Sequence, residues 1–125
     1  MEIDVPKDCG NAPKKNFLKD FHIAIASGDI SFLSQQITDA ISWEIIGGKS
    51  ITTKTLYLEA IQNHPLWKAE RLVIDKIITH GIDASVNGTS STTKGDKFAF
   101  CDIYIFKSFK GMELKSIKSF IIPLS

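Results

Sequence analysis

The sequence predicts an α+β domain in which a cone-shaped, curved antiparallel sheet wraps around three N-terminal helices. Apolar residues recur at helical spacing in the first half of the chain. From Leu66 onward, β-branched and aromatic runs are separated by short turns, which is the pattern of consecutive strands. A chain of 125 residues, 43% hydrophobic and 23% charged, is typical of one globular domain. We therefore expect a single domain over residues 1–125, with residues 1–12 as an irregular lead-in.

The first helix is expected to begin near Asn11, whose side chain can cap it, with Pro13 in the first turn. Ser27 and Gly28 should end it, because glycine readily takes the left-handed conformation that follows many helices. One face of this segment is apolar, and its residues are Phe17, Leu18, Phe21, Ala24 and Ile25.

Two shorter helices with a strand between them are expected next. Asp29 caps the second helix, residues 41–46 form a strand ended by two glycines, and Thr52 or Thr53 caps the third helix. Residues 63–65 end the third helix, since a residue before proline resists the helical conformation. The side chains expected to face inward are Phe32, Leu33, Leu56, Tyr57, Ala60 and Ile61.

Four consecutive strands are expected in the second half, over residues 71–80, 82–92, 97–109 and 112–123. Short turns join them, so they should form an antiparallel meander. Asn87-Gly88 leaves two interpretations open, a tight hairpin turn or a bulge within a strand. Helices gathered in one half and strands in the other indicate helices packed in the cup of a curved sheet.

Asp102 is the best single candidate for a site, because it is the one carboxylate within the apolar stretch Phe98–Phe109. A buried, ionised carboxylate requires a partner or a wet pocket. If Asp102 points into the cup, strand alternation turns Phe98, Phe100, Tyr104 and Phe106 the same way. The outward row is then also apolar, which predicts that a second copy of the chain covers it as a homodimer: Ala99, Cys101, Ile103 and Ile105.

Three stretches in order carry a resemblance to a known superfamily: Ala26–Leu33, Ile37–Ile45 and Phe100–Phe120. Together they resemble the nuclear transport factor 2-like superfamily, in particular its SnoaL-like and ketosteroid-isomerase-like members, over about residues 13–122. The resemblance implies a small bacterial subfamily without an assigned function. It also implies dimers that form through the outer face of the sheet.

Ketosteroid isomerases place a carboxylate base, a tyrosine and a protonated aspartic acid in this cup. The resemblance puts the protonated acid at Asp102 and the base at or next to Glu44. The tyrosine position falls on Phe21, which has no hydroxyl, so half of the oxyanion hole is missing. This departure weighs against an isomerase.

The most economical interpretation is a domain that binds a small, mostly apolar ligand in the cup. Two alternatives stay open: an isomerase, cyclase or hydrolase that uses Asp102 as acid and Glu44 as base, and a dimerisation domain whose cup is filled by its own side chains. For Glu44 a solvent-facing strand position is favoured over the role of a base. The expected ligand-lining residues besides Asp102 are Phe17, Phe21, Trp43, Phe100, Tyr104, Ile117, Ser119 and Ile121.

Other functional classes find little support in the sequence. A net charge of +1 without a basic stripe argues against a nucleic-acid binder. Cys9 and Cys101 make neither a disulfide framework nor a metal-ligand spacing, so no metal or cofactor is expected. There is no apolar run of about 18 residues and no signal peptide, which predicts a cytoplasmic protein. Of the histidines, His22 and His64 are expected in solvent, and His80 could reach the mouth of the cup.

Overall fold

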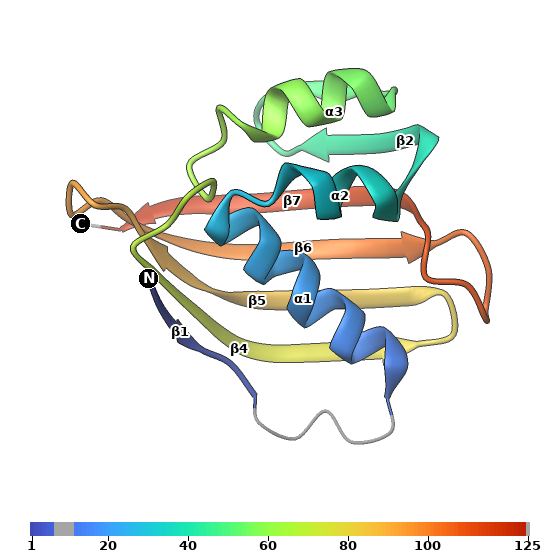
Figure 1. Cartoon of the computed structure of the whole chain (residues 1–125), viewed down its shortest axis with the longest axis horizontal. Helices are drawn as coiled ribbons and strands as arrows, with labels where there is room; N and C mark the ends of the chain where they lie inside the picture. Colours follow the sequence, from blue (N-terminus) through green and yellow to red (C-terminus); the bar gives the residue numbers. More distant parts are fainter. Residues whose placement is uncertain (7–11, 125) are drawn as a thin grey trace.

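The computed structural model describes residues 1–6 and 12–124, which form three helices on one face of a seven-stranded sheet (Figure 1). The strand order is β1-β4-β5-β6-β7-β2-β3. The helices are α1 (Pro13–Ser27), α2 (Ile30–Gln36) and α3 (Lys54–Ile61). The strands are β1 (Glu2–Asp4), β2 (Ile37–Ile45), β3 (Ser50–Ile51), β4 (Arg71–His80), β5 (Asp83–Ser91), β6 (Lys97–Phe106) and β7 (Leu114–Leu124).

The expected meander is confirmed, because β4, β5, β6 and β7 pair consecutively and antiparallel. The sheet as a whole is mixed rather than antiparallel, and it is not closed. At one side β2 runs parallel to β7, and at the other β1 runs parallel to β4. Both parallel pairs join segments that are far apart in the sequence, so no local sequence pattern predicts them.

Two short strands were not expected. Residues 2–4 lie within the predicted irregular lead-in. The prediction is wrong for these residues, because they pair with Arg71–Val73. The second is β3, which folds back on β2 after the glycine turn and places Ile51 opposite Trp43. Neither segment is long enough to show an alternating pattern, and long-range pairing alone makes each a strand.

Helix ends follow the expected caps. Gly28 ends α1 with a φ of 77°, and Asp29 accepts a hydrogen bond from the Phe32 backbone N–H at 3.1 Å at the start of α2. Thr53, rather than Thr52, caps α3. Leu56 is half exposed, so its predicted inward position is wrong. The predicted cap Asn11 lies outside the described residues, as does Cys9.

Asn87 and Gly88 form no turn. They continue β5, and the irregularity is on the neighbouring strand, where Asp75 is the extra residue between Ile74 and Lys76. At Gly88 the two backbones approach so closely that a side-chain Cβ would lie 1.9 Å from the carbonyl oxygen of Val73. A bulge at this place bends β4 and increases the local twist of the sheet.

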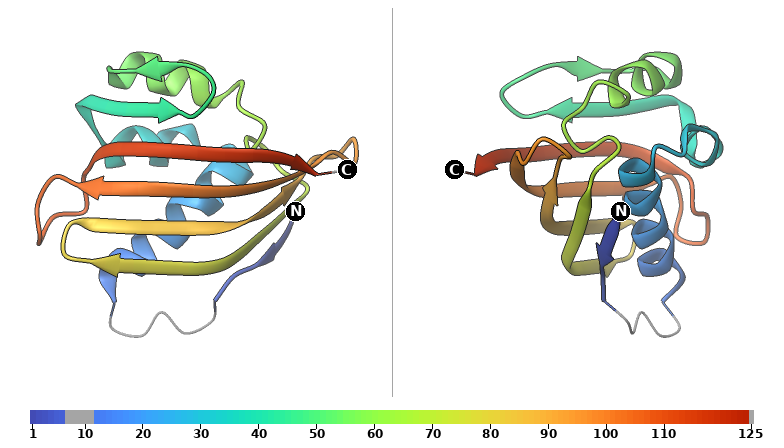
Figure 2. Two further views of the ribbon diagram at one scale, coloured as in Figure 1. Left: turned by 180° about the vertical axis from the view of Figure 1, so that it is seen from behind. Right: turned by 60° about the vertical axis from the view of Figure 1, so that its left-hand side comes forward.

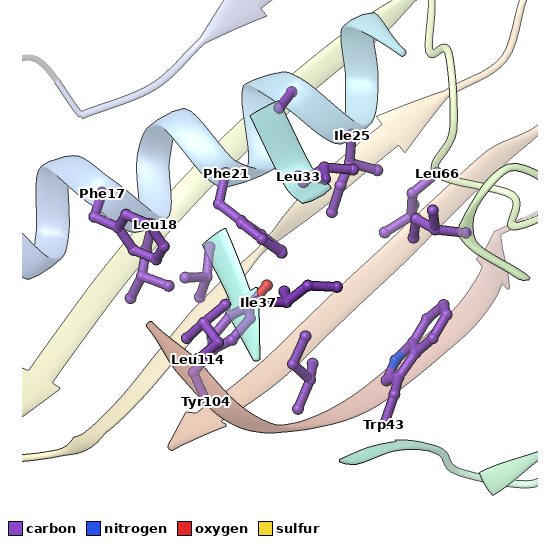
Figure 3. Close-up of a cluster of buried hydrophobic side chains, with 14 of the residues drawn as sticks. Phe17, Leu18, Phe21, Ile25, Leu33, Ile37, Trp43, Leu66, Tyr104 and Leu114 are labelled. Atoms are coloured by element: carbon purple, nitrogen blue, oxygen red, sulfur yellow. The ribbon is translucent and has the colours of Figure 1, made fainter. Parts of the chain in front are cut away.

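The core lies between the helices and the inner face of the sheet. Figure 3 shows Phe21 and Ile25 of α1, Trp43 of β2 and Tyr104 of β6 pointing into the same layer. The opposite face of the meander carries no helix, as the view from behind in Figure 2 shows. The two faces of the sheet are therefore in different environments.

Candidate functional site

Asp102 lies at the centre of the inner face of β6 and is 4% exposed. The predicted alternation holds, since Phe100, Tyr104 and Phe106 are buried on the same side. Ser119 of β7 lies directly opposite Asp102 in the strand register. The sheet thus holds the carboxyl group at a fixed position in the middle of the core.

A buried polar network surrounds this carboxyl group. Tyr104 Oη lies 2.6 Å from His22 Nε2, and His22 Nε2 lies 3.5 Å from Asp102 Oδ2. Asp102 also hydrogen-bonds with the side chains of Ser119 and Tyr104. The indole Nε1–H of Trp43 donates to Ser119 Oγ at 2.9 Å. The network therefore joins α1, β2, β6 and β7.

Burial shifts both acid–base groups of this network toward their neutral forms. It raises the pKa of Asp102 from 3.8 to about 7, although hydrogen bonds from Ser119 and Tyr104 act in the opposite direction. Burial likewise lowers the pKa of His22 to about 3. The charged form of each group is the one that loses water, so both pKa shifts have the same cause.

The Tyr104 hydroxyl has only one proton to donate, so the direction of the hydrogen bonds depends on Asp102. With Asp102 ionised, Tyr104 donates to the carboxylate and accepts from the Nε2–H of His22. With Asp102 protonated, the carboxyl O–H donates to Tyr104, and Tyr104 donates to a bare Nε2. Burial raises the pKa of Asp102 and so favours the second arrangement.

A small cavity borders Asp102. Its volume of about 10 Å³ is at the lower limit of what holds one water molecule. Besides Asp102, its walls contain the expected Phe21, Trp43, Tyr104, Ile117 and Ser119 together with Ile25, Tyr57, Ile61, His64 and Leu66. The cup is thus nearly filled, and its walls are formed by β2, β6, β7, α1, α3 and the segment that follows α3.

Three predicted lining residues lie elsewhere. Phe17 packs against Phe21 and Phe106 in the core, and Phe100 stacks on the His22 ring at 5.1 Å. Ile121 lies in a separate hollow on the surface. None of the three borders the cavity.

Glu44 and Asp102 are not brought together. Trp43 faces the core, so alternation along β2 turns Glu44 to solvent, where it lies 3.9 Å from Lys118. A base on this outer position has no path to the cavity. His80 is exposed and pairs with Asp83 at the end of the meander where β4 and β5 are joined.

Two histidines expected in solvent are in fact part of the site. His22 is 2% exposed, and its spacing from Leu18 and Ile25 would have placed it on the apolar face of α1. His64 is partly buried against the Trp43 ring, with ring centres 5.5 Å apart. It lies on an irregular segment, where no periodicity could have located it.

Helices packed on one face of a curved, mixed sheet are the arrangement of the nuclear transport factor 2-like fold. Solved structures of this fold cover 86% to 95% of the chain. A nuclear transport factor 2-like protein of unknown function from Cytophaga hutchinsonii is 23% identical, covers 87% of this chain and 99% of its own, and has a TM-score of 0.68.

Two structures with named activities are similar at lower identity. A ketosteroid isomerase-like protein from Kribbella flavida is 10% identical over 90% of this chain and 79% of its own, with a TM-score of 0.72. An LEH-like epoxide hydrolase from M. tuberculosis is 12% identical over 87% and 82%, with a TM-score of 0.68. No protein-family model matches the chain, and no curated protein matches it in sequence.

Two further properties concern the described part of the chain alone. No helix in it is long and apolar enough to cross a membrane. Among the same residues, no three His, Cys, Asp or Glu side chains are grouped as a metal ion would require.

Proposed function

We propose that this chain is a homodimeric domain that binds a small, mostly apolar ligand at Asp102, with the ligand oxygen taking the place of water in the cavity. The observation that carries the proposal is the group of ionisable side chains at one buried point. A buried acid whose pKa lies near neutrality, beside a cavity, is a typical arrangement of a functional site. A protonated Asp102 would donate a hydrogen bond to a carbonyl or hydroxyl oxygen.

The ligand requires the cup to open, because the cavity holds no more than one water molecule. The sheet side of the cavity is fixed by hydrogen-bonded strands. The opposite wall consists of Phe21 and Ile25 of α1 and of α3 with the segment after it, which contribute Tyr57, Ile61, His64 and Leu66. We therefore assign the opening movement to this wall.

Binding is favoured over catalysis. The acid of the proposed acid–base pair is in the cup, whereas Glu44 lies on the outside of the sheet. Phe21 meets Tyr104 edge to face at 5.9 Å and supplies no hydroxyl. The similar structures named as an isomerase and a hydrolase keep catalysis as an alternative, and here a second catalytic group would have to come from Tyr57 or His64, which line the cavity.

We expect cyclohexanone to bind in the wild-type cup and to shift the carboxyl ¹³C signal of Asp102 saturably in an NMR titration. Methylenecyclohexane, which has the same shape but no oxygen, should not. Asp102→Leu should abolish cyclohexanone binding, followed in the variants by saturation-transfer NMR on the cyclohexanone signals, and should still fold, because Tyr104 keeps its partner His22 and Ser119 keeps Trp43. Asp102→Asn, which retains hydrogen bonding, should keep most of the cyclohexanone binding.

A closed dimerisation domain is the second candidate, and the small cavity volume favours it. It predicts that neither compound reaches Asp102. It also predicts that Asp102→Leu is destabilised by about 1–3 kcal/mol, as expected when a structural hydrogen-bonding group is removed. Thermal unfolding of the variants beside wild type therefore separates the two candidates.

The proposed dimer interface is the helix-free face of the sheet. Ile103 is 41%, Phe120 37% and Ile122 61% exposed in the single chain, and Cys101 lies opposite Phe120 in the strand register. Adjacent apolar side chains on two strands form the kind of continuous patch that a second protomer covers.

Ile103→Lys should convert the dimer to monomer or aggregate, because it adds a second charge beside Lys118, its register partner, at the border of this patch. Ile78→Lys, at an isoleucine of β4 that is 52% exposed and lies two strands away, is the control and should disturb assembly less. Sedimentation velocity at micromolar concentration measures both. A wild-type chain that sediments as a monomer contradicts the proposed dimer.

A further inference from the structure

A second hollow on the surface shares one wall residue with the Asp102 cavity. Its volume is about 320 Å³, and it lies between the end of β2, the segment after α3 and the end of β7. Its walls include Ile45, Asn63, His64, Pro65 and Ile121. Among the described residues, His64 alone lines both this hollow and the buried cavity.

The His64 ring carries an unpaired buried donor. Its Nδ1 accepts a hydrogen bond from the Leu66 backbone N–H at 3.2 Å, so a neutral ring carries its proton on Nε2. This Nε2 is buried without a hydrogen-bond partner. Burial also lowers the pKa of His64 to about 4, which keeps the ring neutral at pH 7. An unpaired buried N–H is unfavourable and indicates an acceptor that binds there.

Other residues of the wall are poorly suited to move. Tyr57 is 1%, Ile61 2% and Leu66 6% exposed, so displacing any of them exposes a large apolar side chain. Turning the His64 ring outward breaks one hydrogen bond and one ring contact with Trp43. The lowest barrier between the two hollows is therefore at His64.

We propose that the surface hollow is the vestibule of the cup and that His64 is the movable wall between vestibule and cavity. This inference rests on the proposed function. The vestibule is apolar at Ile45, Ala60 and Ile121 and polar at its rim, where Lys49 and Asn63 lie. The ligand that it admits has a compact apolar body and an oxygen acceptor, which pairs with the Nε2–H of His64 on its way to Asp102.

Acrylamide quenching of Trp43 fluorescence tests the wall without any ligand. The other tryptophan is removed by Trp67→Phe, and all variants are made in that background. Trp43 is 2% exposed and lines the cavity, so quenching in the parent should be weak. His64→Ala joins the two hollows and should increase the quenching constant several-fold, whereas His64→Phe keeps the wall and should leave it near the parent value.

Leu66→Ala is the matched control, because Leu66 lines the cavity but not the vestibule. It enlarges the cavity without opening it, so quenching should stay low. Equal increases in His64→Ala and Leu66→Ala would show general loosening and overturn the inference, as would an unchanged constant in His64→Ala. If His64→Ala does not fold, His64→Ser, which also has a small side chain, replaces it in the quenching test. Because no ligand is used, this test can fail while cyclohexanone still binds at Asp102.

Discussion

The stability of the wild-type protein relative to Asp102→Asn should fall by about 4 kcal/mol as the pH rises from about 4 to above 7, since a pKa difference of three units corresponds to that free energy. In the unfolded chain Asp102 loses its proton near its ordinary pKa of 3.8, while the folded chain keeps it until about pH 7. Ionisation therefore favours the unfolded state throughout this window, and Asn has no proton to lose.

Protonation of the buried histidines changes the free energy of unfolding in the opposite direction with pH. Burial lowers the pKa of His22 to about 3, so the unfolded state takes up a proton first as the pH falls below 6.5, and stability is lost on acidification. This contribution is common to both proteins and largely cancels in the comparison. Urea unfolding at matched protein concentration, at several pH values, measures the difference. Parallel stability curves would show that Asp102 titrates normally and would remove the basis of the proposed site.

Gly88→Ala should destabilise the protein by about 3 kcal/mol or more, at the upper end of what overpacking costs. The added Cβ would lie 1.9 Å from the Val73 carbonyl oxygen and 3.0 Å from Ile74 Cα. Both atoms belong to the backbone of β4, so they cannot move without disturbing the pairing of β4 with β5.

Gly48→Ala is the matched control for that substitution. Its nearest neighbour would be Ile45 Cγ2 at 3.5 Å, an ordinary contact at an exposed position. We expect a change within about 0.5 kcal/mol. Thermal unfolding of the two variants beside wild type makes the comparison. Similar losses in both would mean that glycine at position 88 is not required by the close approach of the strands.

The sequence predicted what depends on local pattern. Alternation along residues 97–106 placed Asp102 inward and Ile103 outward, and the caps at Asp29 and Thr53 located two helices. It did not predict β1 or the parallel pairing of β2 with β7, because these contacts join distant segments.

The sequence predicted only the part of the candidate site that lies in regular strands. Asp102, Trp43 and Ser119 lie in strands whose alternation fixes their direction. Whether the cup is open or filled by its own side chains was left as two alternatives, since that depends on how Tyr57 and Leu66 pack across the sheet. Glu44 stayed ambiguous until the inward position of its neighbour Trp43 was known.

The bulge at Asp75 also protects the molecule from fibre formation. β1 covers the outer edge of β4 only at Arg71–Val73, and beyond Val73 no described residue pairs with that edge. An unpaired, regular edge can add strands from other chains without limit. Here the edge is interrupted by an irregular residue and followed by the exposed, charged Lys76. The protein can therefore carry apolar side chains on an open sheet face while its edge resists templated aggregation.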